Sequence, residues 1–318
     1  MTEAKQGAAS PASGDADAGS TDSGSSTDSG SASSSTSQPS DSELPSPALA
    51  KAGSENFPVA TRLLPRRFRR HLLAVYAFAR LVDDVGDEGE IGSGDRHRQL
   101  DLIEDDLHRV YTGSARIPAM RELAVTVAAC DIPAEPFQRL IAANRQDQLV
   151  RRYARFDELL DYCALSANPV GHIVLHIFGV ATSERKRLSD QVCTALQLAE
   201  HWQDVAEDFD RGRVYLPAED LAAFGCTEAD LAASHASARI RELMSFEARR
   251  AGRMLDDGAA LVSTLSGFAR LAVAGYVAGG RAALAPIANR GCDVLSSTPK
   301  AGSMRMAREW LRLSAGRG

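Results

Sequence analysis

The sequence predicts an all-α protein whose single helical domain, residues 49–318, follows a disordered tail of residues 1–48. From Pro65 onward the apolar residues recur at helical spacing, and no long stretch alternates as a β-strand would. Neither an internal repeat nor a linker divides this part of the chain. We therefore expect one helical bundle with a central cavity, where side chains on facing helices build the ligand site.

The tail is distinct in composition and charge. It consists mainly of Ser, Ala, Gly and Asp, and such a segment buries too little apolar surface to offset the entropy of an ordered chain. Its seven acidic residues and one lysine, Lys5, give −6, which equals the net charge of the whole protein. The remaining chain is formally neutral, so we do not expect nucleic acid as a partner.

Helical periodicity divides the domain into eight expected helices. They cover about 66–85, 96–112, 119–130, 134–150, 156–178, 184–208, 236–257 and 260–284. Gly113, Gly212 and Gly225 stand where helices are expected to stop.

The sequence also indicates the compartment. The N-terminus has no secretory signal pattern, and no apolar run reaches the roughly 18 residues of a membrane span. The five cysteines are scattered and form no C-x-x-C pair, as expected of free thiols. These observations favour a cytoplasmic protein.

The first chemically informative feature is an acidic cluster at the end of the first expected helix. Asp83 and Asp87 are four residues apart and share one helical face. Like charges at this spacing, near a helix C-terminus, destabilise the helix unless a cation offsets them. A solvated acidic helix end is the alternative for this cluster alone.

A second cluster repeats the spacing. Glu200, Asp204 and Asp208 form one stripe on another helical run, and no Lys or Arg lies four residues from Asp204. Two such stripes facing each other across a bundle would form an anionic wall of hard oxygen ligands. This donor set suits Mg²⁺, whose coordination is usually completed by substrate phosphate oxygens. The sequence therefore predicts a magnesium-bound diphosphate.

Basic residues accompany both clusters. Arg80 precedes Asp83 by three residues, and Arg213 follows Asp208 in DRGRVYLP. The alternative for Arg80 is an ion pair with Asp84 on its own helix. Metal and guanidinium groups beside a leaving diphosphate would promote ionisation of a C–O bond, which indicates carbocation chemistry.

Four segments resemble the squalene/phytoene synthase family: ENFPVATRLLP, YAFARLVDDVGDE, YCALSANPVG and HWQDVAEDFDRGRVYLP. The resemblance covers about 54–290, and SENFPVA, SANPVG and Trp202-Gln203 resemble the bacterial hydroxysqualene synthase branch. It implies a type I isoprenoid synthase fold, with Mg²⁺ at Asp83/Asp87 and Asp204/Asp208, Glu200 being a further candidate ligand. The same resemblance implies prenyl chains in the central cavity and association with neighbouring squalene-pathway enzymes.

The resemblance also assigns roles to further residues. Those expected near the diphosphate are Ser54, Asn56, Arg80, Gln197, Arg213 and Tyr215. Those expected along the hydrocarbon cavity are Phe57, Tyr76, Tyr162 and Tyr276. Ordinary core packing is the alternative for each aromatic residue, whereas together their π-faces would suit a carbocation.

Two positions depart from the family pattern. Many members carry Asn where this chain has Glu200, and Arg where it has Gln203. The loss of a cation at Gln203 favours an enzyme that converts presqualene diphosphate to hydroxysqualene. Head-to-head condensation to presqualene diphosphate or phytoene is the alternative reaction. A non-catalytic accessory subunit is a further alternative, which the intact aspartates disfavour.

The remaining polar features predict less. His172, His176 and His201 lie in helical runs without an H-E-x-x-H pattern, and packed or surface roles are expected for them. The C-terminal stretch Met304–Leu313 has an apolar and a basic side. It is expected either to pack on the domain or to contact the inner face of the cell membrane peripherally.

Overall fold

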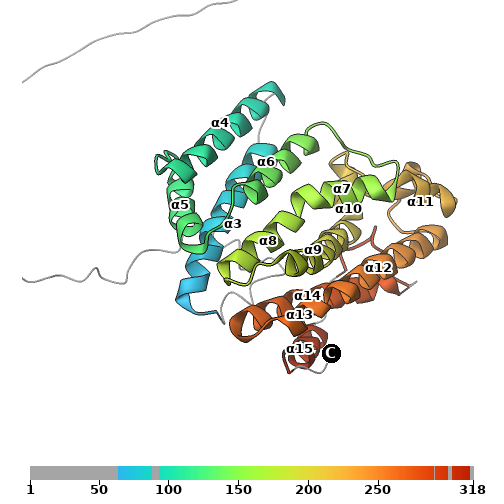
Figure 1. The fold of residues 1–318 in the computed structure, drawn as a ribbon. Coiled ribbons are helices and arrows are strands. Elements are labelled where there is room, and N and C mark those ends of the chain that lie inside the picture. The colour runs from blue at the N-terminus through green and yellow to red at the C-terminus, as the bar shows by residue number, and fades with distance from the viewer. Residues whose placement is uncertain (1–63, 88–92, 290, 300–302, 316–318) are drawn as a thin grey trace, which may run out of the picture. The chain divides into compact units, whose positions relative to one another are not determined.

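The computed structural model describes residues 64–87, 93–289, 291–299 and 303–315. All of them belong to one compact unit of the chain. Apart from one isolated β-bridge, the regular secondary structure of the described residues is helical, which confirms the all-α prediction (Figure 1). The boundary predicted between residues 48 and 49 lies outside the described residues.

The helices follow one another along the chain with short connections. In order they are α3 (Arg66–Asp87), α4 (Ser93–Thr112), α5 (Pro118–Cys130), α6 (Glu135–Asp147), α7 (Phe156–Ser166), α8 (Asn168–Ile177), α9 (Ser183–Gln203), α10 (Val205–Asp210), α11 (Ala218–Ala223), the 3-10 helix η1 (Glu228–Ala232), α12 (Ala238–Gly258), α13 (Ala260–Thr264), α14 (Gly267–Ala288) and α15 (Ser303–Ser314). Helices stop before Gly113, Gly212 and Gly225 as predicted, and each of these glycines has a positive φ.

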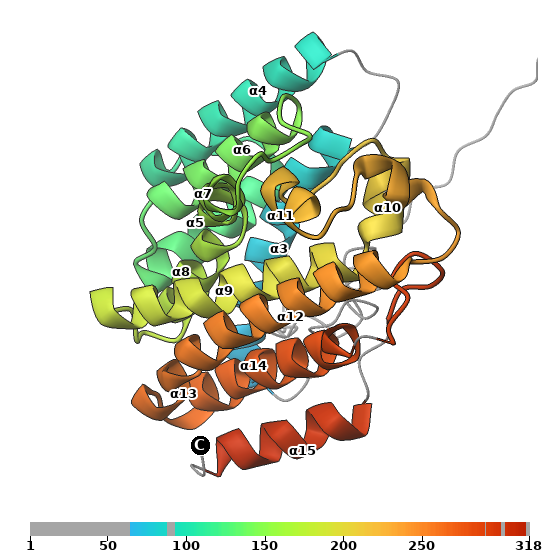
Figure 2. The ribbon, with the colours of Figure 1, turned by 90° about the vertical axis from the view of Figure 1, so that its right-hand side faces the viewer.

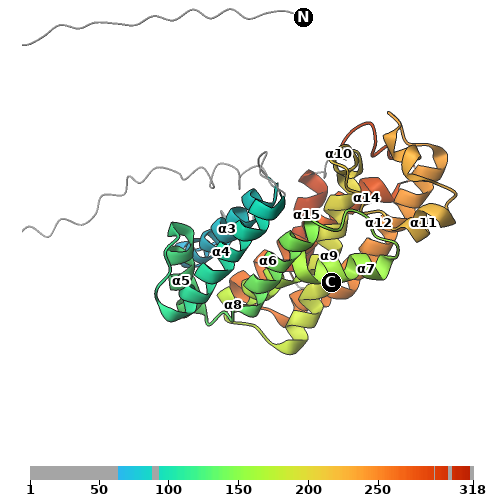
Figure 3. The same ribbon diagram turned by 90° about the horizontal axis from the view of Figure 1, so that it is seen from above.

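Two apolar cores hold the helices together. Phe78, Phe137 and their neighbours fill the first core, among α3, α4, α5 and α6. Trp202 belongs to the second core, to which α7, α9, α12 and α14 contribute. Figure 3 shows α3, α4 and α5 on one side of the molecule and α12 on the other, with α6 and α8 between them. Helix α15 packs on the outside of α14 (Figure 2).

Close backbone approach fixes the centre of the second core. A Cβ on Gly258 of α12 would lie 2.8 Å from the backbone nitrogen of Val192 on α9. A Cβ on Gly280 of α14 would lie 2.6 Å from Leu196, also on α9. Helices α12 and α14 therefore both pack closely against α9, each at a glycine.

Three of the expected helices are each divided in two. The run 156–178 breaks at Ala167, directly before the Asn168-Pro169 pair that begins α8, because proline favours the first turn of a helix. The run 184–208 breaks at Asp204, which has φ −105° and ψ 19°. The run 260–284 breaks at Leu265, whose backbone is extended.

A short backbone pairing joins two distant loops. The amide of Val214 donates to the carbonyl of Arg151 at 2.9 Å, and the amide of Ala218 donates to the carbonyl of Tyr153 at 3.0 Å. The bridge between Arg152 and Val214 is parallel. The loop after α10 therefore lies alongside the loop after α6.

Helix α14 is long and apolar enough, by length and composition, to cross a membrane. The sequence prediction that no apolar run has this character is therefore corrected at this helix. The protein interior buries 56% of its most apolar window, as expected of a core helix.

Candidate active site

The first acidic cluster lies at the C-terminal end of α3. Asp83 is exposed and accepts a hydrogen bond of 3.2 Å from the side-chain amide of Asn144 on α6. Arg80 forms an ion pair of 2.9 Å with Asp84, the alternative that its spacing allowed. Asp87 is the last residue of α3, and its side chain lies outside the described part of the structure.

The second cluster surrounds the break between α9 and α10. Asp204 occupies the break, and its carbonyl accepts a hydrogen bond from the amide of Asp208 at 2.8 Å. The carbonyl of Asp208 in turn accepts one from the amide of Arg213, also at 2.8 Å. Burial, followed by the charges of Asp208 and Glu207, raises the pKa of Asp204. The raised pKa marks a site that disfavours its own negative charge.

Four rings form a buried cluster beside Asp208. His201 stacks on Tyr215 with ring centroids 3.6 Å apart and planes inclined by 16°. Tyr162 and Tyr153 lie 5.8 Å and 5.9 Å from Tyr215. Burial is the main cause that raises the pKa of all three tyrosines, so their hydroxyls stay protonated at neutral pH.

The last turn of α6 connects the two clusters. Asn144 donates to Asp83, and Asp147, three residues later, accepts a hydrogen bond of 3.0 Å from the hydroxyl of Tyr162. Residues three apart are neighbours on a helix surface, so one turn of α6 contacts both the end of α3 and the ring cluster. The pairing of the loops after α6 and α10 brings Tyr215 to the same place. Asp83 and Asp208 thus belong to one connected polar region.

Gln197 and Gln203 occupy different surroundings at the end of α9. The side-chain amide of Gln197 lies 3.1 Å from Nε2 of His201, inside the region of the ring cluster. The amide of buried Gln203 donates instead to the carbonyl of Pro299 at 2.6 Å. Gln203 therefore makes a hydrogen bond to the backbone at the position where many members of the resembling family carry arginine.

The other predicted residues lie beside the second cluster, elsewhere in the bundle or outside the described part of the chain. Tyr276 is on α14, where burial raises its pKa to about 12, and Tyr76 is half-buried on α3. Glu200 is half-buried one turn before Asp204, and Arg213 is half-buried after α10. The predicted contacts of Ser54, Asn56 and Phe57 fall outside the described residues.

The chemistry of these donors fits Mg²⁺ better than a softer metal. Carboxylate oxygens are hard ligands, and burial followed by the charges of Asp208 and Glu207 raises the pKa of Asp204, so a bound cation would stabilise its ionised form. Among the described side chains, no group of three His, Cys, Asp or Glu residues is preassembled to hold a metal. Mg²⁺ is commonly held by one or two carboxylates together with substrate phosphates, so the donors present fit it.

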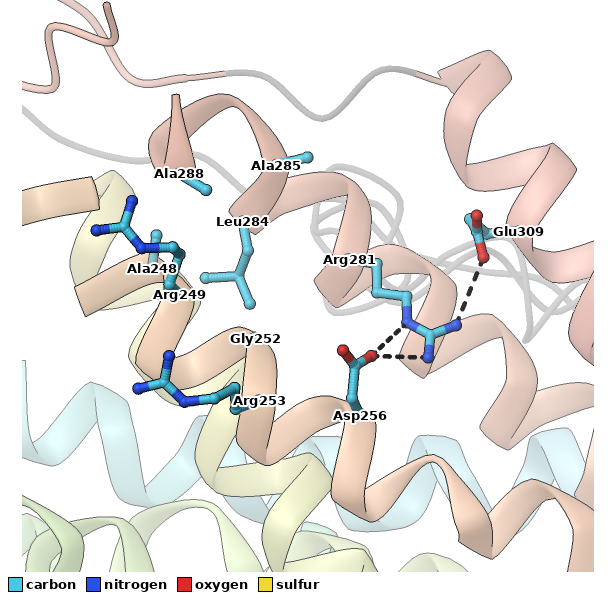
Figure 4. A pocket seen from close by; sticks show the side chains of 10 residues that line it. All are labelled: Ala248, Arg249, Gly252, Arg253, Asp256, Arg281, Leu284, Ala285, Ala288 and Glu309. Atoms are coloured by element: carbon cyan, nitrogen blue, oxygen red, sulfur yellow. Dashed lines mark hydrogen bonds and ion pairs between the residues drawn. The ribbon is translucent and has the colours of Figure 1, made fainter. Parts of the chain in front are cut away.

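A surface hollow of about 420 Å³ lies away from these residues, between α12, α14 and α15 (Figure 4). Arg281 crosses one side of it, with ion pairs of 2.8 Å to Asp256 and 3.4 Å to Glu309. Arg249 and Arg253 form the other side. None of the predicted site residues lines the hollow. The ion pairs of Arg281 connect α14 to α12 and α15.

Comparisons with known proteins identify the family of this chain. The sequence pattern of the squalene/phytoene synthase family matches residues 50–305. A hydroxysqualene synthase of Sinorhizobium fredii is 34% identical over 215 residues, covering 67% of this chain and 72% of that protein. A phytoene synthase of Arthrospira platensis is 34% identical over 211 residues, covering 62% and 68%.

Solved structures share the fold. The crystal structure of squalene synthase HpnC from Alicyclobacillus acidocaldarius has a TM-score of 0.71 and 44% identity, covering 76% of this chain and 90% of that one. A dehydrosqualene synthase in complex with ligand has a TM-score of 0.75 at 23% identity, covering 85% and 94%, and supports the fold alone. The all-α fold and these matches together define the class of protein as an isoprenoid synthase. This chain belongs to the squalene/phytoene synthase family, a family of enzymes.

Sequence reasoning missed three residues of the polar region: Asn144, Asp147 and His201. Asn144 and Asp147 lie in a helix that carries no acidic stripe, and only the packing of α6 against α3 and α7 brings them to the site. His201 directly precedes Trp202-Gln203-Asp204, and its neighbourhood to the aspartates was the available signal.

Proposed function

We propose that this protein converts presqualene diphosphate to hydroxysqualene, with Mg²⁺ bound at the two acidic clusters. The observation that carries the proposal is the connection of Asp83 to Asp208 through Asn144, Asp147 and the ring cluster. It places carboxylates that suit a metal diphosphate beside buried aromatic faces that suit a carbocation. The relatives named above include both hydroxysqualene and phytoene synthases, so the product is inferred from the chain's own residues.

The reaction uses one water and releases one diphosphate. The C–O bond of the substrate breaks with its electron pair on the diphosphate, the resulting cyclopropylcarbinyl cation rearranges, and water adds and loses a proton. When bound, Mg²⁺ supplies charge neutralisation for the leaving diphosphate. Asp83, Asp87, Asp204 and Asp208 would hold it in this proposal, with Glu200 as a further candidate, and Arg80 and Arg213 would add positive charge near the leaving group.

The aromatic residues protect the cation in this scheme. Tyr162 and Tyr215 are buried, and the hydrogen bond from Tyr162 to Asp147 fixes one hydroxyl. Their faces stabilise positive charge without forming a bond to it, because the ring quadrupole is negative above the plane. The buried cluster also limits water near the cation until the rearrangement is complete.

Product analysis tests the proposal. With presqualene diphosphate and Mg²⁺ but no nicotinamide cofactor, the enzyme is expected to release diphosphate and form an alcohol, measured by mass spectrometry. With farnesyl diphosphate alone, turnover is expected to be far slower, because Gln203 offers no cation for a second diphosphate. Efficient formation of presqualene diphosphate without alcohol would assign the chain to the condensing reaction. Absence of any Mg²⁺-dependent diphosphate release would favour an accessory subunit.

We also propose peripheral contact with an anionic membrane through α15. The inner side of this helix packs on the bundle, with Leu313 4% exposed and the indole of Trp310 donating to the carbonyl of Leu271. The outer side carries Met304 and Leu311, which are 89% and 62% exposed. Arginines on the same helix would add attraction to anionic lipids, at about 1 kcal/mol for each one near the surface.

Vesicle sedimentation tests this contact. Full-length protein is expected to bind anionic vesicles more than neutral ones, and Leu311→Ser is expected to weaken that binding. Leu102→Ser is the matched control, because Leu102 of α4 is 64% exposed on a different helix. Equal binding of both variants and the unaltered protein would exclude α15 as the contact.

A further inference from the structure

His201 lies where the two halves of the polar region meet. It belongs to the last turn of α9, is 7% exposed, and stacks on Tyr215 at 3.6 Å. Its ring is also 6.2 Å from that of Tyr162. A histidine buried this deeply requires partners for both of its nitrogens.

The two nitrogens have different neighbours. Nε2 lies 3.1 Å from the side-chain amide nitrogen of Gln197, and Nδ1 lies 3.7 Å from Oδ2 of Asp208. An ionised carboxylate only accepts hydrogen bonds, so the nitrogen that faces Asp208 is the one that must carry a proton. Nε2 is then an acceptor for the amide N–H of Gln197. Both neighbours favour a proton on Nδ1 over a proton on Nε2.

Asp208 lies on a short helix beside His201. It lies beyond the break at Asp204, on α10, which is six residues long, and its side chain is 16% exposed. The separation of 3.7 Å is longer than a hydrogen bond but within reach of one after a small rotation. Carboxylates that bind metals are generally held by such hydrogen bonds, and loss of the partner weakens metal binding about 10–100-fold.

We propose that His201 is a positioning residue that holds the Asp208 carboxylate, through Nδ1–H, in the orientation that binds the metal diphosphate. The inference rests on the proposed function, because it assumes that Asp208 is a metal ligand. It adds a role for a residue that the spacing of the acidic clusters does not reveal. The stack on Tyr215 and the contact with Gln197 keep the imidazole in the orientation this role requires.

Two substitutions separate the hydrogen bond from the packing. His201→Phe keeps an aromatic ring on Tyr215 but removes the donor. His201→Asn removes the ring but keeps an N–H close to the position of Nδ1. If His201 serves only to pack against Tyr215, Phe is the milder change. If it positions Asp208, Asn is the milder change.

The measurement is binding of Mn²⁺ with inorganic diphosphate to full-length protein, followed by the electron paramagnetic resonance signal of free Mn²⁺. We expect His201→Phe to weaken binding about 10–100-fold and His201→Asn to retain most of it. Unaltered binding in His201→Phe, or equal weakening in both variants, would overturn the positioning role. If the unaltered protein bound no Mn²⁺ with diphosphate, the proposed function would fail, whereas a failure confined to the variants concerns His201 alone.

A second measurement applies even if a variant does not fold. ¹⁵N chemical shifts of the histidine rings in the unaltered protein report which ring nitrogen carries the proton. The signals of His201 are those missing from the spectrum of a folded variant at that position, such as His201→Gln. A proton on Nδ1 supports the proposal. A neutral ring protonated on Nε2 overturns it.

Discussion

Replacing Asp204 by asparagine tests the metal site by its effect on folding as well as on turnover. The carboxylate of Asp204 is repelled by Asp208 and Glu207, four and three residues away. Each such pair costs a helix about 0.2–0.5 kcal/mol. Asparagine is as favourable as aspartate at the start of a helix, so the backbone at the break is retained. We therefore expect Asp204→Asn to stabilise the ligand-free protein by about 0.5–1 kcal/mol, or about 1–4 °C in Tm.

The stabilisation is expected to depend on pH. The pKa of Asp204 is raised in the folded state, so its contribution to stability is fully present below the unfolded pKa and is lost as pH rises through the folded value. The advantage of Asp204→Asn should therefore be largest at pH 7–8. It should shrink as pH falls through the raised pKa and vanish below about 3.9, the ordinary value for aspartate.

Addition of Mg²⁺ with diphosphate is expected to make the unaltered protein more stable than Asp204→Asn. At 100 times the dissociation constant, Mg²⁺ with diphosphate should stabilise the unaltered protein by about 2.7 kcal/mol, and the variant by much less. Turnover of the variant should fall at least about 100-fold. Asp210→Asn is the matched control, because Asp210 is exposed on the same short helix and is not one of the charges that raise the pKa of Asp204. A variant that is less stable, still active and still stabilised by Mg²⁺ with diphosphate would refute the metal-site reasoning.

Three further predictions concern the rest of the chain. Gly258→Ala should destabilise the protein by about 1–3 kcal/mol in urea unfolding, because the added Cβ would meet the backbone of α9. Gly252 lies on the same helix with open space around it, so Gly252→Ala should stabilise the protein by about 0.5–1 kcal/mol. Similar effects of the two substitutions would contradict the close packing at Gly258. At a pH high enough to ionise buried Glu247, Arg250→Met should cost about 3–5 kcal/mol by leaving that carboxylate without its ion pair of 2.5 Å. Burial raises the pKa of Glu247 to about 8, and removing Arg250 would raise it further, so unfolding at several pH values should show a loss that grows as the pH rises above about 8; a loss that does not grow there would exclude this cause. Deletion of residues 1–48 should leave steady-state rates unchanged, and a large decrease would reveal a specific contact of the tail.

The sequence predicted those features that depend on local periodicity. The first expected helix, 66–85, agrees with α3 to within two residues because its apolar face and its acidic end lie in one continuous run. The break at Asp204 was not predicted, since the residues on both sides favour a helix and neither glycine nor proline marks the break. A straight helix would have placed Asp204 and Asp208 on one stripe.

The candidate site was predicted where carboxylates repeat at a fixed spacing, and was missed where it depends on packing. Asp147 and Tyr162 are 15 residues apart and meet because α6 and α7 are neighbouring helices joined by a short loop. His201 was expected to pack or to be exposed. It is packed, yet its two nitrogens face Gln197 and Asp208, a fact that no helical pattern encodes.

The parallel bridge between Arg152 and Val214 has a consequence for how the protein acquires its site. Closing a chain segment of roughly 60 residues costs entropy that must be met before the contacts it permits can form. Helices α7 and α8 lie within that segment and contact mainly α6, α9 and each other, so they are expected to form earlier. Tyr215 would then join the ring cluster in one of the last steps of folding. A folding intermediate with most of its native helix content would still be unable to bind diphosphate.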